Sequence, residues 1–185
     1  MNKITHGVVH GRFQPPHNGH IRYILAGLER TEHLIIGICT PKICTEEEAA
    51  ASGYPCTKEL NPFTFEERAT MISLALDEAG IARDRYTCMP FPSDYQYVKE
   101  RLPEGTVFLM SVTGAGDEKK IEYLKNLGLT VETIFSIPEG NERERSGVIR
   151  DSVQKGTTEW EKIMPKSITN YMKERHMLER LANLL

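Results

Sequence analysis

The 185-residue sequence lacks several features that would place it in a whole class of proteins. It has no run close to the ~20 apolar residues that a membrane helix needs, and its first residues, MNKITHGVVHG, lack a signal-peptide pattern. It also lacks a basic excess, because 23 Lys and Arg stand against 26 Asp and Glu, for a net charge of −3. We therefore expect a cytoplasmic protein with neither a membrane nor a nucleic-acid partner.

Cysteine is scarce and carries no metal-binding pattern. The four cysteines Cys39, Cys44, Cys56 and Cys88 form no C-x-x-C pair, and no cluster of Cys or His has zinc-ligand spacing. We therefore predict no metal ligands. The expected state is four reduced thiols, as in most cytosolic proteins, and a disulfide between Cys44 and Cys56 is the alternative.

Histidine, by contrast, is concentrated at one end of the chain. Five of the six histidines lie within the first 33 residues, at positions 6, 10, 17, 20 and 33. Residues 1–45 also hold five Lys or Arg against two acidic residues, whereas the remainder of the chain is acidic. This part of the chain is where we expect an anionic ligand to bind.

Short apolar runs alternate with helical patterns along the whole chain. The predicted strands are Gly7–His10, Leu34–Cys39, Arg85–Met89 (closed by Pro90), Thr106–Val112 and Thr130–Phe135. Leu34–Cys39 is continuously apolar, as is typical of a strand buried on both faces of a parallel sheet. We predict a single domain over residues 1–185 with a Rossmann-like, doubly wound, five-stranded parallel α/β sheet and helices on both faces.

Three further segments complete the predicted organisation. Residues 40–62 mix small, acidic, Gly and Pro residues without a period, which predicts a mobile surface loop. The pair Thr64 and Glu67 has capping-box spacing and predicts the start of a helix. Residues 146–185 form a C-terminal helical segment, with a short helix after Ser146 and a long one from about Pro165.

The string GRFQPPHNGH lies where the first predicted strand passes through a loop into a helix. Its residues His17 and His20 are three apart, so they project from the same side of the helix start. That helix start supplies free N–H groups and a partial positive charge, and Arg12 adds a cation. A Walker P-loop is absent, and the two histidines lack the third ligand of a metal site. These groups match what a polyphosphate undergoing transfer requires.

GRFQPPHNGH resembles the signature of the nucleotidyltransferase superfamily with the H-x-G-H motif. The strand LIIGI, the string NPFTFEERATMI and the tail segment WEKIMPK are similar to the archaeal-type nicotinamide mononucleotide (NMN) adenylyltransferases. The opening VVHGRFQPPHNGH and the later PFPSDYQ are similar to the CTP-dependent cytidylyltransferases that activate phosphonates. The chain is too short for a class I aminoacyl-tRNA synthetase, which shares the H-x-G-H string, and it has no KMSKS string.

The resemblance implies an enzyme that moves a nucleoside monophosphate from a nucleoside triphosphate to the phosphate or phosphonate of a small molecule, with release of pyrophosphate. The first expectation is adenylyl transfer from ATP to NMN, which makes NAD. The alternative is cytidylyl transfer from CTP to a phosphonate or phosphoalcohol, and an alternative of another class is a non-catalytic nucleotide-binding sensor. Mg²⁺ is expected on the triphosphate, held by phosphate oxygens and water.

The resemblance also implies roles for individual residues. The catalytic candidates are His17, His20 and Arg12. The candidates for binding the nucleotide and its phosphates are Gly11, Phe13, Gln14, Gly19, Ser146 and Arg150, and those for binding the acceptor are Tyr95, Tyr97 and Gly114.

The chain departs from the family pattern at three places. Gly147 stands where a Thr or Ser is usual, which removes one hydroxyl contact to phosphate. Residues 94–97 carry tyrosines where the adenylyltransferases have an Asn and a Trp, and residues 114–116 replace a Gly-Asn-Pro turn. These changes affect the groups that would contact nicotinamide and its ribose. Many family members are oligomers, and an apolar stripe in the last helix offers either an oligomer interface or, more simply, a face packed on its own sheet.

Overall fold

The computed structural model describes residues 3–52, 56–112, 115–136 and 146–183. Its centre is a five-stranded, all-parallel sheet with the strand order β3-β2-β1-β4-β5. The strands are β1 (Ile4–Gly11), β2 (Thr31–Cys39), β3 (Tyr86–Phe91), β4 (Val107–Val112) and β5 (Thr130–Ser136). The predicted Rossmann-like parallel sheet is therefore confirmed. The order reverses beside β1, between β1 and β4, and ligands of such sheets bind at this switch point, beyond the carboxyl ends of the strands.

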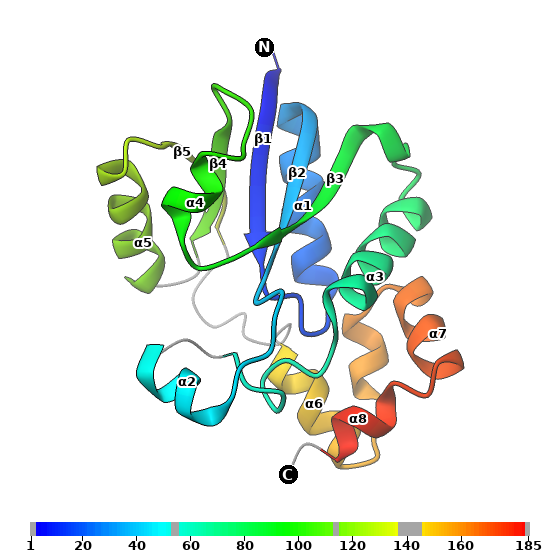
Figure 1. Cartoon of the computed structure of the whole chain (residues 1–185). Coiled ribbons are helices and arrows are strands. Elements are labelled where there is room, and N and C mark those ends of the chain that lie inside the picture. The colour runs from blue at the N-terminus through cyan, green and yellow to red at the C-terminus, as the bar shows by residue number, and fades with distance from the viewer. Residues whose placement is uncertain (1–2, 53–55, 113–114, 137–145, 184–185) are drawn as a thin grey trace.

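Helices cover both faces of the sheet (Figure 1). The main ones are α1 (Asn18–Arg30) and α3 (Phe65–Glu78) on one face, and α4 (Tyr95–Lys99) and α5 (Ala115–Asn126) on the other. Successive strand residues point to opposite faces, so Val9 and Leu109 belong to the core cluster under α1, whereas Val8 and Phe108 belong to the cluster under α4 and α5. This two-sided burial is the reason that the central strands carry apolar residues at consecutive positions, such as Val8 and Val9.

The predicted start of α3 is confirmed. The Thr64 hydroxyl accepts a hydrogen bond from the backbone N–H of Glu67, and the Glu67 carboxylate accepts one from the N–H of Thr64. The helix ends at Glu78, two residues before the predicted Gly80, with Ala79 as its C-cap, and Gly80 follows with a φ of 73°, which suits a residue without a Cβ.

Two predicted boundaries are wrong for identifiable reasons. Strand β3 does not stop before Pro90 but continues through it to Phe91, because β3 is the edge strand and a missing N–H there breaks no ladder bond. The long C-terminal helix is two helices, α7 (Lys166–Glu174) and α8 (Leu178–Ala182), separated at His176, which has a φ of 53°.

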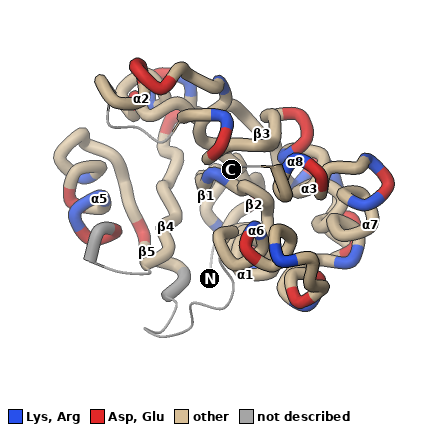
Figure 2. Tube along the Cα trace, turned by 90° about the horizontal axis from the view of Figure 1, so that it is seen from below, with Lys and Arg blue, Asp and Glu red and all other residues tan. Residues whose placement is uncertain are grey.

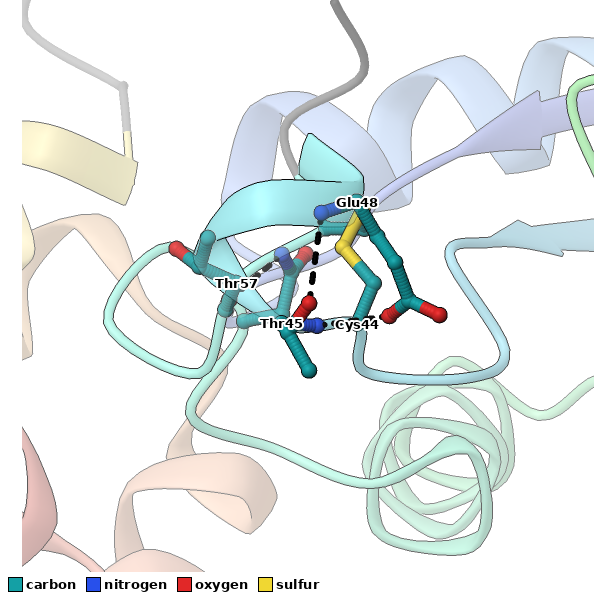
Figure 3. Close-up of a disulfide and its surroundings, with 6 residues drawn as sticks. Cys44, Thr45, Glu48 and Thr57 are labelled. Carbon is teal, nitrogen blue, oxygen red and sulfur yellow. Dashed lines mark hydrogen bonds between the residues drawn. A yellow bond between two sulfur atoms is a disulfide. The ribbon is translucent and has the colours of Figure 1, made fainter. Parts of the chain in front are cut away.

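Residues 40–62, predicted to lack regular structure, contain the short helix α2 (Glu46–Ser52). Thr45 and Glu48 cap its start with two reciprocal hydrogen bonds. Cys44 and Cys56, with Cα atoms 5.3 Å apart, form a disulfide beside this helix (Figure 3). Two of the four thiols expected to be reduced are therefore oxidised, and the alternative pairing is the one observed; Cys39 and Cys88 are free.

The C-terminal segment joins the main core rather than standing apart from it. It contains α6 (Ser146–Gln154), a 3₁₀ helix (Glu159–Ile163), α7 and α8. Within the predicted apolar stripe, Met172, Met177 and Leu181 are buried against the same core cluster as α1 and α3. This stripe packs on the chain itself. None of the helices in the described ranges is long and apolar enough to cross a membrane.

Candidate active site

The candidate site lies at the carboxyl edge of the sheet, where β1 ends at Gly11 and residues 12–17 lead into α1. Helices α2 and α6 lie beyond this edge (Figure 1), and Figure 2 views the molecule from this side. Lys and Arg positions lie at the end of β1 in that view. This is the place at which doubly wound sheets bind their ligands.

His17 and His20 cap the start of α1 reciprocally. The Nδ1 of His17 accepts from the backbone N–H of His20 at 3.4 Å, and the Nδ1 of His20 accepts from the backbone N–H of His17 at 3.3 Å. The two rings lie close together, with centroids 3.7 Å apart. The H-x-G-H spacing therefore produces a histidine version of the capping box.

This capping arrangement determines where the imidazole protons lie. Because each Nδ1 accepts a hydrogen bond, each neutral ring carries its proton on Nε2, which makes Nε2–H a donor directed away from the helix start. Burial, His17 and Arg12 together hold the pKa of His20 well below its usual value, so this ring is neutral at pH 7. The pair thus offers two fixed N–H donors beside the positive end of a helix.

Two arginines from distant segments approach each other near this pair. Burial first, and then the charge of Arg12, lowers the pKa of Arg150, which lies on α6. The Ser146 hydroxyl at the start of α6 donates to the carbonyl of Pro15 at 3.3 Å and so ties this helix to the loop after β1. Among the residues that the structure describes, no carboxylate forms an ion pair with Arg12 or Arg150. Two neighbouring guanidinium groups without a carboxylate partner among the described residues favour the binding of an anion here.

The other predicted nucleotide-binding residues contribute mainly to the shape of the loop. The Gln14 side chain is buried and forms two hydrogen bonds to the backbone of Phe63. The Phe13 ring is buried 5.0 Å from the His20 ring, and a Cβ on Gly11 would lie 3.0 Å from that phenyl ring. Gly19 is buried in the first turn of α1. These residues hold the histidines and the loop in place.

A buried arginine that sequence reasoning did not single out fixes the same loop. Arg68 on α3 is 1% exposed and donates to the carbonyls of Arg12 (2.7 Å), Cys39 (2.6 Å) and Thr40 (2.8 Å). Its Nε donates to the carbonyl of Thr64. The guanidinium thus joins the chain just after β1 to the chain at the end of β2. A helical arginine in an EERAT string carries no sequence signal for this role.

The predicted acceptor residues are separated in the structure. Tyr95 lines a cavity of about 270 Å³, which we call the Lys120 cavity, lined by His10, Gly11, Arg12, Cys39, Pro92, Ser93, Tyr95 and Lys120. Tyr97 is 46% exposed, stacks under the Arg101 guanidinium, and lines a neighbouring cavity of about 900 Å³ beside the disulfide. Gly114 lies outside the described residues. Of the two that the structure describes, Tyr95 shares a cavity with Arg12 and Tyr97 lines the other one.

Lys120 is a functional candidate that motif reasoning did not assign, and it shares its cavity with His10. The ring of His10 is 8% exposed, with Nε2 3.1 Å from the Tyr95 hydroxyl. Lys120 lies on α5, where the polar string DEKK is typical of a solvated face. Its ammonium is 5.6 Å from the centre of the Tyr95 ring. Only the packing of α5 against the sheet brings Lys120 to this cavity.

The described residues contain no group of three or more His, Cys, Asp and Glu side chains arranged to hold a metal ion. The polar groups nearest the histidine pair are cations and N–H donors, which favour an anion.

Buried His10 predicts a pH-dependent stability. Burial first, and then the charge of Lys120, holds its pKa well below 6.5 in the folded protein, whereas the unfolded chain protonates it normally. The unfolded state therefore binds more protons below pH 6.5. We expect the contribution of His10 to the free energy of unfolding to fall by up to about 1.4 kcal/mol per pH unit below pH 6.5.

Urea unfolding of the wild type and of His10→Phe at pH 7.5 and pH 5.5 measures this dependence. The variant keeps a ring against Phe91, which stacks on His10 at 4.8 Å, but it has no proton to bind. It should therefore lose less stability than the wild type on acidification. Equal losses in the two proteins would contradict the assignment.

Comparisons with known proteins find relatives that match nearly the whole chain. A family model described as cytidylyltransferase-like matches residues 8–149. Phosphonoformate cytidylyltransferase of Streptomyces viridochromogenes is 33% identical over 95% of this chain and 94% of its own length. Nicotinamide-nucleotide adenylyltransferase of Thermococcus sibiricus is 30% identical over 96% of this chain and 88% of its own.

The fold is also found in solved structures. A bifunctional NMN adenylyltransferase/ADP ribose pyrophosphatase from Francisella tularensis superposes with a TM-score of 0.66 at 19% identity. The match covers 97% of this chain but only 52% of the Francisella protein, so the chain spans about half of that bifunctional enzyme. A second structure of that enzyme, in complex with AMP and a manganese ion, superposes with a TM-score of 0.63.

Proposed function

The chain belongs to the cytidylyltransferase-like family and is a nucleotidyltransferase, and on this premise we propose that it transfers a cytidylyl group from CTP to a small phosphonate. The first expectation, transfer from ATP to NMN, belongs to the same reaction class. The two differ in the base of the donor and in the size and charge of the acceptor. The choice between them therefore depends on the acceptor side of the site.

The Lys120 cavity is the observation that carries this proposal. Its volume of about 270 Å³ lies below the ~300–1,000 Å³ of pockets that hold drug-sized ligands, so it suits a short acid better than a mononucleotide with a base and a ribose. Arg12 lines this cavity, and its charge also lowers the pKa of His20 and of Arg150. A phosphonate bound in the cavity would therefore face the phosphate-binding groups directly. Cytidylyl transfer to phosphonoformate is the activity for which the Streptomyces relative is named.

In the proposed reaction an anionic oxygen of the phosphonate attacks the α-phosphorus of CTP. A new P–O bond forms, the bond between the α-phosphorus and the bridging oxygen breaks, and pyrophosphate leaves with that electron pair. No proton has to be removed from the nucleophile, and no covalent enzyme intermediate is required. Burial raises the pKa of Cys39 in the cavity wall to about 11, so that thiol stays protonated at pH 7.

The chain supplies position and charge in this mechanism. We assign the Nε2–H groups of His17 and His20 to the oxygens around the α-phosphorus, where negative charge grows in the transition state. Arg12 and Arg150 bind the phosphates that leave, and Ser146 holds α6 against the loop. Because the capping bonds fix the two imidazoles beforehand, little reorganisation is needed during the reaction.

Mg²⁺ belongs to this proposal through the triphosphate. The described residues contain no group of three or more His, Cys, Asp and Glu side chains that could hold a metal ion, so in this proposal phosphate oxygens and water would hold Mg²⁺. When bound, Mg²⁺ neutralises charge on the phosphates. The cationic side chains bind the remaining phosphate oxygens.

Adenylyl transfer to NMN is the second candidate, and the activity named for the Thermococcus relative supports it. Residues 94–97 weigh against it, because they carry tyrosines where the adenylyltransferases have an Asn and a Trp. Tyr97 also lies in the neighbouring larger cavity and not with Tyr95.

A pyrophosphate-release assay separates the two candidates. CTP, ATP, GTP and UTP are each combined with phosphonoformate, methylphosphonate and NMN in the presence of Mg²⁺. We expect turnover with CTP and a phosphonate, with kcat/KM at least tenfold above that of any ATP and NMN reaction. The His20→Ala protein, purified identically, controls for contaminating activity.

Turnover of ATP with NMN, and none of CTP with either phosphonate, would overturn the proposed substrate pair. It would leave the nucleotidyltransferase chemistry intact. Variants of His17, His20 and Arg150 test the roles of the site residues separately.

A further inference from the structure

Lys120 is a cation in a partly enclosed place, and no anion among the described residues forms an ion pair with it. Its side chain is partly buried, and it lines the cavity with Tyr95 and His10. No carboxylate in the described parts of the chain lies within ion-pair distance of its ammonium, although Asp117 acts on it from farther away. A cation removed from water costs free energy unless an opposite charge compensates it. This position is therefore suited to an anionic ligand.

Tyr95 supplies a second polar group beside this ammonium. Its hydroxyl is held 3.1 Å from the Nε2 of His10, and the His10 ring is fixed by stacking on Phe91. Burial and Lys120 keep the pKa of His10 low, so His10 orients the tyrosine as a neutral ring. A hydroxyl and an ammonium thus line the same cavity on fixed supports.

The two cations of the cavity act on different neighbours. Arg12 acts electrostatically on His20 and Arg150, which belong to the proposed transfer site. The charge of Lys120 lowers the pKa of His10. Both cations also act to lower the pKa of Cys39, against the larger effect of burial. Of the two cations that line the cavity, Arg12 is therefore coupled to the residues assigned to the reacting phosphates, and Lys120 is coupled to the cavity wall. No carboxylate is found among the residues that line it.

We propose that Lys120, together with Tyr95, binds a carboxylate at the far end of the acceptor, so that the substrate is a short phosphonate carrying a carboxylic acid. This inference rests on the proposed function, because it takes the phosphonate end to lie at Arg12. A carboxylate is favoured over a second phosphonate because it is the smaller group and the cavity is small. The nicotinamide ring of NMN is positively charged, and Lys120 would repel it.

Substitution of Lys120 tests the proposal. Lys120→Met keeps most of the length of the side chain and removes the charge, and the exposed neighbour Lys119→Met is the matched control. Each protein is assayed with CTP and either phosphonoacetate, which has the carboxylate, or methylphosphonate, which lacks it. We expect Lys120→Met to raise the KM for phosphonoacetate at least tenfold and the KM for methylphosphonate less than twofold.

Two further variants separate recognition from structure. Lys120→Arg restores the charge and should recover part of the affinity for phosphonoacetate. Tyr95→Phe removes the hydroxyl and should raise the same KM by a smaller factor. If Lys120→Met changes the KM of both acceptors equally, or of neither, the proposed carboxylate site is wrong.

A binding measurement distinguishes failure of this inference from failure of the proposed function. Phosphonoacetate and methylphosphonate are titrated into the wild type and Lys120→Met by calorimetry, without nucleotide. Absence of turnover with every phosphonate would refute the proposed function. A tenfold loss of phosphonoacetate binding in Lys120→Met would still support the site, and equal binding by the two proteins would refute it.

Discussion

Replacing His17 or His20 with a residue that lacks the imidazole N–H is expected to lower kcat about 10²–10³-fold, with a much smaller change in KM. The expectation rests on fixed geometry, because the reciprocal capping bonds leave both Nε2–H groups as donors toward the ligand. Loss of one preorganised donor to a developing charge typically costs about 2.7–4 kcal/mol of transition-state stabilisation. Steady-state pyrophosphate release under saturating CTP measures the change in kcat.

The choice of variants separates this catalytic role from the capping role. His17→Ser keeps an N-cap acceptor for the N–H of His20 but has no N–H to offer the phosphate, so α1 should stay folded while kcat falls. His6→Ala is the matched control, because His6 lies near the opposite end of β1. Near-normal turnover in both His17→Ser and His20→Ala would refute the assignment.

Arg150→Ala should give a different kinetic signature. Its guanidinium is assigned to the leaving phosphates, so its loss should raise the KM for CTP more than it lowers kcat. Unchanged affinity for the nucleotide would count against this placement.

Arg68→Ala is expected to produce the largest loss of stability, about 3–5 kcal/mol of the free energy of unfolding, as is typical when one partner of a buried charged network is removed. The guanidinium donates to carbonyls at the ends of both β1 and β2, and those carbonyls would lose this donor. Phe13 and Thr40, next to these carbonyls, have φ values of 52°, so this edge of the sheet also holds strained backbone. Urea unfolding at pH 7.5 measures the loss.

Two other arginine variants act as controls for Arg68→Ala. Arg83→Ala removes an exposed arginine that pairs with Asp77 on the surface, and its effect should be small. Arg68→Lys keeps a charge that can reach some of the carbonyls and should give an intermediate loss. An Arg68→Ala unfolding curve that coincides with the wild-type curve would show that these hydrogen bonds do not hold the edge together.

The core of the fold was predictable because strand and helix geometry requires particular residue types at nearby positions in the sequence. Parallel strands buried on both faces must be apolar at consecutive positions, as Leu34–Cys39 is, and a helix start needs acceptors for its N–H groups, as Thr64 supplies. The string GRFQPPHNGH likewise contains its whole chemistry within ten residues. His17 and His20 could therefore be predicted as the centre of the proposed site without any tertiary contact.

The predicted ends of helices and strands were wrong where they depend on the position of the element in the fold. Pro90 is tolerated within β3 only because that strand lies at the edge of the sheet, and strand order is not a local property. The pairing of Cys44 with Cys56 likewise depends on how the chain returns after α2. Sequence reasoning could offer that pairing only as an alternative.

The sequence by itself indicated the reaction class and predicted the histidine pair, because both follow from residues adjacent along the chain. Tertiary structure decided which residues line the proposed acceptor cavity, because it brings Lys120 of α5, Tyr95 of α4 and His10 of β1 together and places Tyr97 in another cavity. It also turned Arg68, a charge on an amphipathic helix, inward to hold the loop after β1. The physical reason is that side-chain proximity across a sheet depends on the order of the strands in the sheet. The crossover connections set this order, and the periodicity of the sequence does not reveal it.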